Sequence, residues 1–448
     1  DEDDHNCGKR YEELATLVDS LKECSRKKDL HKGTQIHVDI IDTGLVEKNM
    51  YVGSALVSLY MKCGKLEKAQ EIFDKISNRD AVCWTSLIAG YAQNGYAEKA
   101  LECFENMKRA GFFPNVVTYV CILKACGHSI GACEKGQEVH AEIVGGGFLD
   151  RNAFIGNALV DMYIKLGKLD KAREVFDTLQ VRDTVTWTVL IAGYTQYGYG
   201  EEAVECFQMM MEDGFSPDAT TFACILKACG RMEVIKGQEI HAQIVEEGWL
   251  GKDALVGNAL VDMYAKCGRI ERAQMVFNEL SFRDIVSWNA LISGYVQHGK
   301  GAEVIDCFEQ MKNDLITPDV VTYVCTLKTC GSIGMIEKGK EIHTEIIRKG
   351  LLKRDPTLGS ALVDMYVKCG LCLQAQQVFD EISARNVISW NTLITGYVQY
   401  GMADSVLNCY EQMLSEGISP DDVTFLCCLK ACASLGNIEK GQKVHVQI

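Results

Sequence analysis

Two short motifs in this 448-residue chain have residue types and spacing that could form a zinc site. His343 and Glu345 stand two residues apart, and Cys369 and Cys372 follow in a Cys-Gly-Leu-Cys run. In zinc-dependent deamination a histidine and two cysteines bind the metal, and the glutamate transfers protons. Taken alone, the spacing would suggest hydrolytic chemistry on a base.

The recurrence of both halves along the chain indicates that this match is a coincidence. Lys368 stands where the zinc motif requires proline, and Leu166 replaces the first cysteine in another copy. The copies of His343 are His37, His140, His241 and His445, and those of Cys369 are Cys63 and Cys267. No glycine-rich phosphate loop or nucleophile elbow occurs, and acidic pairs such as Glu201-Glu202 fit a solvated helix surface. We predict no metal site, no cofactor and no catalytic residue in this chain.

Composition limits the partners that the chain can bind. The 21 cysteines recur inside helical patterns, so we interpret them as small buried hydrophobic residues in a reducing compartment. Because the net charge is −15, binding to nucleic acid would have to depend on local lysines and on contacts with bases. The chain has neither a run of eighteen apolar residues nor a basic, apolar-centred leader. We therefore expect a soluble protein with no membrane partner, from which any targeting segment has been removed.

The chain is built from a repeat in which three kinds of marker recur every 101 to 103 residues. The markers are Pro114, Pro217, Pro318 and Pro420; Arg-Asp or Arg-Asn pairs that end at Asp80, Asp183, Asp284 and Asn386; and Trp84, Trp187, Trp288 and Trp390. Within a period, motif starts separate sub-units of 35, then 35 to 37, then 31 residues. Two earlier pieces (14–49 and 50–80) and a truncated one (422–448) bring the total to thirteen.

Each sub-unit carries two amphipathic helical stretches. In SWNALISGYVQHG and the following GAEVIDCFEQMKND, apolar residues recur at three- and four-residue spacing. Gly95, Gly198, Gly299 and Gly401 end the first stretch. One helical pair cannot cover its own apolar face, so neighbours must stack. The pattern predicts an all-α fold, a right-handed α-solenoid superhelix of about thirteen helix-turn-helix motifs with a long concave groove.

Segments such as VSWNALISGY, NALVDMYAKCG, GQEIHAQIV and TLKTCGSIGMIEKGKEIH resemble plant pentatricopeptide repeat (PPR) proteins. The rotating lengths resemble the PLS class of that family, and the three sub-units are named P, L and S motifs accordingly. The resemblance covers residues 14–448 and leaves residues 1–13 as an N-terminal extension. Tetratricopeptide repeats form a similar solenoid, but their W-x2-L-G-x2-Y pattern is absent here.

The resemblance implies that the fifth and last residues of each P and S motif together read one base of single-stranded RNA. Short polar side chains can reach the Watson–Crick edge of an unstacked base. The implied guanine readers are Ser54 with Asp80 and Thr188 with Asp218, and the adenine readers are Thr85 with Asn115 and Ser360 with Asn386. The implied uracil readers are Asn157 with Asp183, Asn258 with Asp284, Asn289 with Asp319, and Asn391 with Asp421.

The L motifs depart from this pattern because their fifth residues are apolar, namely Val18, Val120, Ala223, Val324 and Leu426. We expect them to read bases poorly. With the N-terminus facing the 5′ end of the RNA, as the resemblance implies, the predicted ligand is 5′-nGAnUGnUUnAUn-3′. Helix capping is the alternative role for the last residues. It does not explain the polar fifth residues, which lie inside a predicted helix.

Two further sets of residues match positions that the family uses for RNA. The second residues of several motifs are implied to clamp bases from either side, with packing between repeats as the alternative: Tyr51, Val82, Phe154, Val185, Leu255, Val286 and Ile388. Lysines at the end of the first helix of the S motifs are implied to contact phosphates: Lys62, Lys165, Lys266 and Lys368. Their alternative role is to complement the helix dipole.

The PLS-like organisation is similar to that of organellar C-to-U RNA editing factors. We therefore expect a sequence-specific RNA-recognition tract, located in a mitochondrion or chloroplast with the mitochondrion favoured, and working beside a cytidine deaminase or other editing partner. Stabilisation or processing of an organellar transcript is an alternative. A protein-interaction scaffold is another, and the acidic charge supports it.

Overall fold

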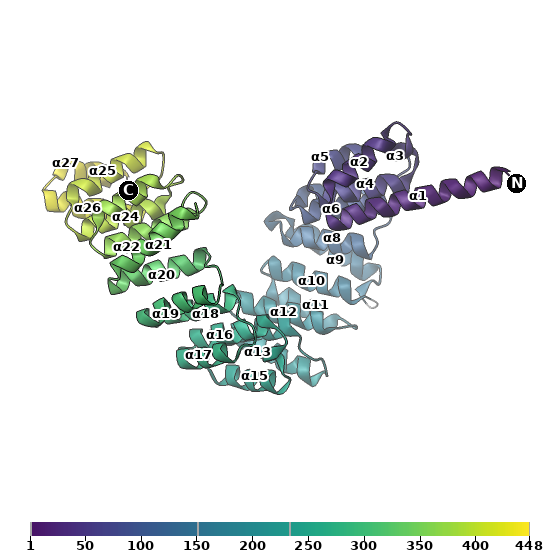
Figure 1. Ribbon diagram of the computed structural model, residues 1–448. Helices are drawn as coiled ribbons and strands as arrows, with labels where there is room; N and C mark the ends of the chain where they lie inside the picture. The colour runs from purple at the N-terminus through teal and green to yellow at the C-terminus, as the bar shows by residue number, and fades with distance from the viewer. Residues whose placement is uncertain (1, 150–151, 233, 448) are drawn as a thin grey trace. The chain divides into compact units, whose positions relative to one another are not determined.

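The computed structural model describes residues 2–149, 152–232 and 234–447, and within them every regular element is a helix. The chain forms two compact units, residues 1–228 and 229–448. In each unit, helices pair into hairpins and the hairpins stack (Figure 1). The described α-helices form thirteen consecutive pairs along the sequence, with the four-residue α3 as an extra element. The prediction of an all-α solenoid of about thirteen hairpins is confirmed.

The first unit contains a row of first helices, each followed by a second helix. The first helices are α1 (Glu2–Lys27), α4 (Met50–Lys62), α6 (Ala81–Gln93), α8 (Val116–Gly127), α10 (Ala153–Lys165), α12 (Thr184–Tyr197) and α14 (Ala219–Cys229). The second helices are α2 (Leu30–Ile41), α5 (Leu66–Lys75), α7 (Ala97–Arg109), α9 (Cys133–Gly145), α11 (Leu169–Thr178) and α13 (Gly200–Glu212). The connections of the L motifs carry the short α3 (Leu45–Lys48) and η1 (Ile130–Ala132).

The second unit repeats this pattern. It opens with the second helix α15 (Val234–Glu246), and its first helices are α16 (Ala254–Lys266), α18 (Ile285–Gln297), α20 (Val320–Ile333), α22 (Pro356–Lys368), α24 (Val387–Gln399) and α26 (Asp422–Leu435). The other second helices are α17 (Ile270–Glu279), α19 (Gly301–Asn313), α21 (Ile336–Arg348), α23 (Cys372–Glu381), α25 (Ala403–Ser415) and α27 (Ile438–Gln447), and the short η3 spans Trp249–Gly251.

First helices contact first helices. In the first unit α4, α6, α8, α10 and α12 touch in succession, and in the second unit α16, α18, α20, α22, α24 and α26 do the same. Glycine makes this close approach possible. A Cβ on Gly90 of α6 would lie 2.3 Å from Met61 Cγ, and one on Gly396 of α24 would lie 2.6 Å from Val367 Cγ1. The row of first helices carries all the predicted fifth residues.

An aromatic contact explains why arginine and tryptophan recur together at each S-to-P junction. Trp288 of α18 packs edge-on against Phe277 of α17, with ring centroids 4.6 Å apart. The Arg283 guanidinium lies over the Phe277 ring, 5.0 Å from its centroid, and Arg283 Nε donates to Phe277 O. The guanidinium thus stabilises the C-terminal end of α17 while the aromatic pair fills the core.

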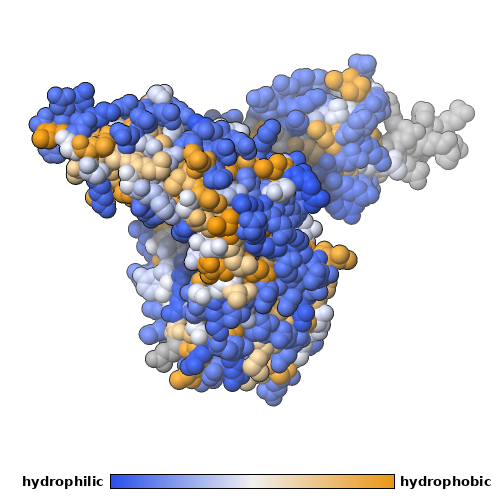
Figure 2. Space-filling view, turned by 60° about the vertical axis from the view of Figure 1, so that its left-hand side comes forward, coloured by the Kyte–Doolittle hydropathy of each residue, from blue (hydrophilic) through white to orange (hydrophobic). Residues whose placement is uncertain are grey.

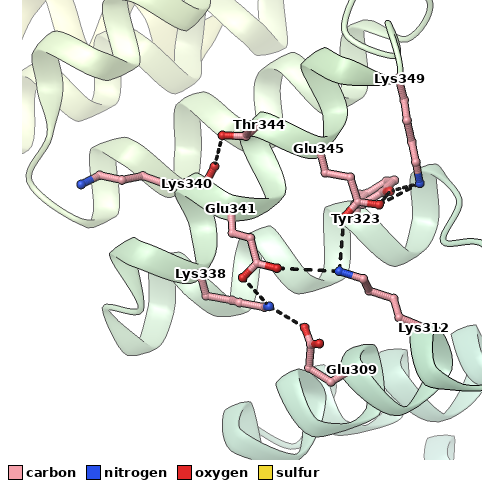
Figure 3. Close-up of polar contacts among 9 residues, drawn as sticks. All are labelled: Glu309, Lys312, Tyr323, Lys338, Lys340, Glu341, Thr344, Glu345 and Lys349. Atoms are coloured by element: carbon pink, nitrogen blue, oxygen red, sulfur yellow. Dashed lines mark hydrogen bonds and ion pairs between the residues drawn. The ribbon is translucent and has the colours of Figure 1, made fainter.

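Ion pairs join the second helices α19 and α21 (Figure 3). Lys338 of α21 lies 2.5 Å from Glu309 of α19 and 2.7 Å from Glu341. Lys349 lies 2.8 Å from Glu345 and also donates to the hydroxyl of Tyr323 on α20. The Lys338–Glu309 pair joins α21 to α19 of the preceding hairpin, and the Lys349–Tyr323 contact joins the end of α21 to α20 of its own hairpin.

Three smaller expectations can be compared with the described residues. Every cysteine whose side chain is described is a free thiol that is buried or half-buried, as predicted. Gly198 ends α12 in the left-handed region with φ 83°, which confirms its role at the helix end. No described helix is both long and apolar enough to cross a membrane. The helix α1 runs through residue 14, and the boundary between extension and repeats at that residue stays a prediction.

Candidate functional site

The eight last residues of the P and S motifs all lie at the start of a first helix. Each accepts a hydrogen bond from the backbone N–H three residues later, as Asp421 does from Thr424 at 3.0 Å. The set is Asp80, Asn115, Asp183, Asp218, Asp284, Asp319, Asn386 and Asp421. Capping is therefore part of what these residues do, and their reading of bases stays a prediction.

The four predicted uracil pairs are brought into direct contact. In each, the asparagine Nδ2 donates to the carboxylate of the partner that lies 26 or 30 residues later in the sequence. The distances are 3.3 Å for Asn157 and Asp183, 3.1 Å for Asn258 and Asp284, 3.1 Å for Asn289 and Asp319, and 2.8 Å for Asn391 and Asp421. The geometry therefore makes one polar group of each pair.

In two of the pairs these contacts favour the ionised carboxylate. Burial opposes ionisation of Asp183, but hydrogen bonds from Thr186 and Asn157 bring its pKa below the usual value. Hydrogen bonds from the Thr424 backbone and from Asn391 lower the pKa of Asp421 as well. At neutral pH both groups are acceptors with a full negative charge.

The other four pairs are linked through a third residue or not at all. Thr85 Oγ1 lies 2.8 Å from Thr118 Oγ1, which in turn lies 3.0 Å from Asn115 Oδ1. Thr188 reaches Asp218 in the same way through Thr221, and Ser54 reaches Asp80 through Cys83. Ser360 donates only to the backbone oxygen of Pro356, and in the described part of the chain no hydrogen bond joins it to Asn386.

Access to the fifth residues is uneven. Five of them are buried, with 7–9% of their surface exposed: Ser54, Thr85, Asn157, Thr188 and Asn258. Asn289, Ser360 and Asn391 are half-buried. A ligand can therefore touch only the exposed edge of the first group unless those side chains move.

Two equivalent cavities gather the predicted residue types in one place. The Thr85 pocket, in the first unit, has a volume of about 370 Å³ and is lined by Lys62, Val82, Thr85, Gly90, Asn115 and Val117, among others. The Asn391 pocket, in the second unit, has a volume of about 390 Å³ and is lined by Lys368, Ile388, Asn391, Gly396, Asp421 and Val423, among others. Each volume is in the range of roughly 300–1,000 Å³ that is usual for small-ligand sites. Each pocket thus combines a polar pair, two aliphatic walls from successive motifs and a lysine.

The predicted clamping residues are all exposed. Each has 46–73% of its surface accessible, whereas packing between repeats would bury it. The set is Tyr51, Val82, Phe154, Val185, Leu255, Val286 and Ile388. The face shown in Figure 2 is mainly hydrophilic, with hydrophobic patches between the hydrophilic areas. Val117, Val321 and Val423 of the L motifs continue the set with 47–57% exposure. The sequence analysis missed these three because it considered second residues only in motifs with a polar fifth residue.

The four predicted lysines differ in their partners. All four are the last residues of their helices, where a positive charge also complements the helix dipole. Lys165, Lys266 and Lys368 pair with the aspartate one turn earlier at 2.7, 2.5 and 2.8 Å. Lys62 has Ser58 at that position and therefore lacks this ion pair. Aspartates therefore partly neutralise three of the four lysine charges in the absence of a phosphate ligand.

The zinc-like residues have other roles. His343 Nδ1 lies 2.9 Å from the hydroxyl of Tyr366, and His37, His140 and His241 pair with Tyr60, Tyr163 and Tyr264 in the same way. Burial raises the pKa of Cys369 and Cys372, so both are thiols at neutral pH. No group of three metal-binding side chains occurs among the residues that the structure describes.

Family models match most of the repeated region. A model described as a PPR repeat family matches residues 79–128, 182–231, 283–332 and 385–434, and one described as a PPR repeat matches 54–80, 157–183, 258–285 and 360–387. Among solved structures, maize PPR10 in complex with an 18-nt RNA element is similar at 18% identity and a TM-score of 0.55, over 96% of this chain and 72% of that one. Yeast Rmd9p in complex with a 16-nt target RNA is similar at 13% identity and a TM-score of 0.50, over 92% and 98% of the two chains. At these identities the likeness concerns the fold.

Curated relatives from Arabidopsis thaliana cover nearly the whole chain. A chloroplastic pentatricopeptide repeat-containing protein is 35% identical over 98% of this chain and 70% of its own length. A mitochondrial one is 34% identical over 97% of this chain, and another chloroplastic one is 34% identical over the same share. The chain spans 63% and 54% of the lengths of these last two. The matched models, the repeat register and these relatives show together that the chain belongs to the pentatricopeptide repeat family.

Proposed function

We propose that this chain binds single-stranded RNA of a defined sequence, with about one base read by each P or S motif. The observation that carries this proposal is the pair of equivalent pockets. In both, a polar pair lies between two exposed aliphatic side chains of successive motifs, with a lysine at the edge. A base inserted there would be held on both faces and contacted along its polar edge. The RNA complexes named for the two solved structures of the same fold support this ligand class.

The charges indicate which contacts would supply the affinity. With a net charge of −15 and three of four edge lysines already paired, attraction to phosphate is weak. Contacts with bases must then contribute most of the binding free energy. We expect a shallower dependence on salt than basic RNA-binding proteins show.

Equilibrium binding to labelled oligonucleotides tests the proposal. The ligand is 5′-nGAnUGnUUnAUn-3′ with random bases at n, and the control is the same composition in scrambled order. We expect the predicted sequence to bind at least about tenfold more tightly, the size of one or two base contacts. Equal binding of the two RNAs would rule out the proposed register.

The finer role that we propose is recognition within an organellar C-to-U RNA editing factor. Its support is the rotation of motif lengths through P, L and S types and the chloroplastic or mitochondrial relatives. A randomised-RNA selection with this chain should enrich a consensus that lies beside an edited cytidine in an organellar transcript. A consensus found only at transcript ends would favour RNA stabilisation or processing instead.

A protein-interaction scaffold is the second candidate, and the net charge of −15 is the observation that favours it. A scaffold would not distinguish the predicted RNA from the scrambled one. The same binding series therefore separates the two candidates.

A further inference from the structure

A pattern links each fifth residue to the third residue of the motif that follows it. After a polar fifth residue, the next third residue is Cys83, Thr118, Thr186, Thr221, Ser287, Thr322, Ser389 or Thr424. After the apolar fifth residues of the L motifs, it is Val52, Ile155, Val256 or Leu358. All twelve side chains are fully buried. Burying a hydroxyl costs free energy unless it is hydrogen-bonded. Because the buried hydroxyls stand only after motifs with a polar fifth residue, we expect a hydrogen-bond partner at those junctions.

At all four P-to-L junctions that partner includes the fifth residue itself. Thr322 Oγ1 lies 2.6 Å from Asn289 Oδ1 and 2.9 Å from Asp319 Oδ1. Thr424 repeats both contacts with Asn391 and Asp421 at 2.6 and 2.9 Å. At the remaining two, Thr118 and Thr221 contact the hydroxyls of Thr85 and Thr188.

At the S-to-P junctions the contact with a fifth-position asparagine is missing. Thr186 Oγ1 bonds Asp183 at 2.8 Å, and Ser287 Oγ donates to Asp284 O at 2.8 Å. Asn157 Oδ1 and Asn258 Oδ1 are buried, and among the described residues neither has a hydrogen-bond partner. The Asn–Asp pair therefore has one more hydrogen bond in a P motif than in an S motif, the bond from the threonine hydroxyl to the asparagine.

We propose that the buried third residue of the following motif is a positioning residue for base recognition, and that it makes P-motif Asn–Asp pairs more selective than S-motif pairs. This inference rests on the RNA-binding function proposed above. In a P motif the threonine hydroxyl is hydrogen-bonded to the amide oxygen of the asparagine. The asparagine Nδ2 therefore stays directed at the carboxylate and at the base edge. The pair then presents one fixed donor and one fixed acceptor.

A fixed donor and acceptor distinguish uracil from cytosine because the two bases carry opposite groups. Uracil offers a carbonyl acceptor and an N3–H donor, whereas cytosine offers an amino donor and an N3 acceptor. Rotation of the asparagine amide by half a turn exchanges its donor and acceptor. In every pair this breaks the contact between Nδ2 and the carboxylate, and in a P motif it also breaks the contact between the amide oxygen and the threonine hydroxyl. S motifs with Asn157 or Asn258 should therefore discriminate against cytosine less strongly than P motifs with Asn289 or Asn391.

The experiment compares RNAs that carry a single U→C change opposite each of the four asparagines. For the wild-type chain we expect the loss of affinity to be about three- to tenfold larger opposite Asn289 and Asn391 than opposite Asn157 and Asn258, the size of one hydrogen bond. Equal losses at the four positions would overturn the inference. A wild-type chain with no preference for the predicted RNA would instead refute the proposed function.

Matched substitutions separate positioning from stability. Thr322→Val removes the hydroxyl from a P-motif pair and should reduce U-over-C selectivity opposite Asn289, and Thr322→Ser should restore it. Thr186→Val removes the same hydroxyl from the same capping position but leaves an asparagine that it never contacted. Both valine variants should lower the melting temperature similarly, and only the first should change selectivity. Unchanged selectivity in a folded Thr322→Val chain would contradict the assignment.

Discussion

The Thr85 pocket of the first unit and the Asn391 pocket of the second unit share a frame and differ in their polar pair. Both have a lysine, a helix glycine and two aliphatic walls, yet one contains Thr85 with Asn115 and the other Asn391 with Asp421. Under the proposed function the aliphatic walls would pack against any base and the lysine would face phosphate, so neither would distinguish one base from another. Holding a base and choosing one would then depend on separate residues.

Exchanging the polar pair between the pockets should have the largest effect. The double change Thr85→Asn and Asn115→Asp gives the first pocket the pair of the second. We expect the preferred base opposite this motif to change from adenine to uracil, with a reversal of about ten- to a hundredfold in relative affinity. Competition binding with A- and U-containing RNAs measures it. Retained preference for adenine would mean that the frame also selects.

Shortening a wall should weaken binding without altering the preference. Ile388 is 68% exposed, so Ile388→Ala should leave the free energy of unfolding within about 0.5 kcal/mol of wild type. Affinity should fall by a few-fold for every base, because an aliphatic wall contributes less than the ~1–3 kcal/mol of an aromatic platform. Leu373 of α23 is 77% exposed and lines neither pocket, so Leu373→Ala is the matched control and should leave binding unchanged. A loss confined to one base would contradict the separation of holding from choosing.

The two edge lysines should differ in their response to salt. Lys62 lacks the aspartate partner that Lys368 has in Asp364. Lys62→Ala should reduce the slope of log affinity against log salt by up to about 0.7, the value for one phosphate contact on a single strand. Lys368→Ala should reduce it less, and Asp364→Asn should increase it. Identical slopes for wild type and Lys62→Ala would remove this lysine from the phosphate contacts.

Acid should destabilise the two units together, through residues outside the pockets. Burial lowers the pKa of His140 in the first unit and of His343 in the second. In the folded chain their pKa lies below the unfolded value of about 6.5. At a pH between these two pKa values the unfolded chain therefore binds more protons than the folded chain. Their contribution to stability is therefore complete above pH 6.5 and is lost as pH falls toward the folded pKa. Chemical unfolding at pH 7.5 and 5.5 should show less acid destabilisation for His343→Gln than for wild type.

Much of the fold could be predicted because it depends on local sequence patterns that recur in every repeat. Helical periodicity, turn glycines such as Gly198 and capping residues such as Asp183 each act within a few residues of their own position. The ion pairs between lysine and aspartate one turn apart were also readable, since i and i+4 residues face each other on a helix. These pairs lower the net positive charge at Lys165, Lys266 and Lys368.

The sequence by itself determined the register of the thirteen hairpins and the residue types at each junction. Only the tertiary structure decided which of those residues touch. Asn391 meets Asp421 directly, Thr85 meets Asn115 only through Thr118, and Ser360 does not reach Asn386. The reason is that these partners lie 26 to 33 residues apart, so a difference of about one ångström in how two hairpins stack makes or breaks a hydrogen bond.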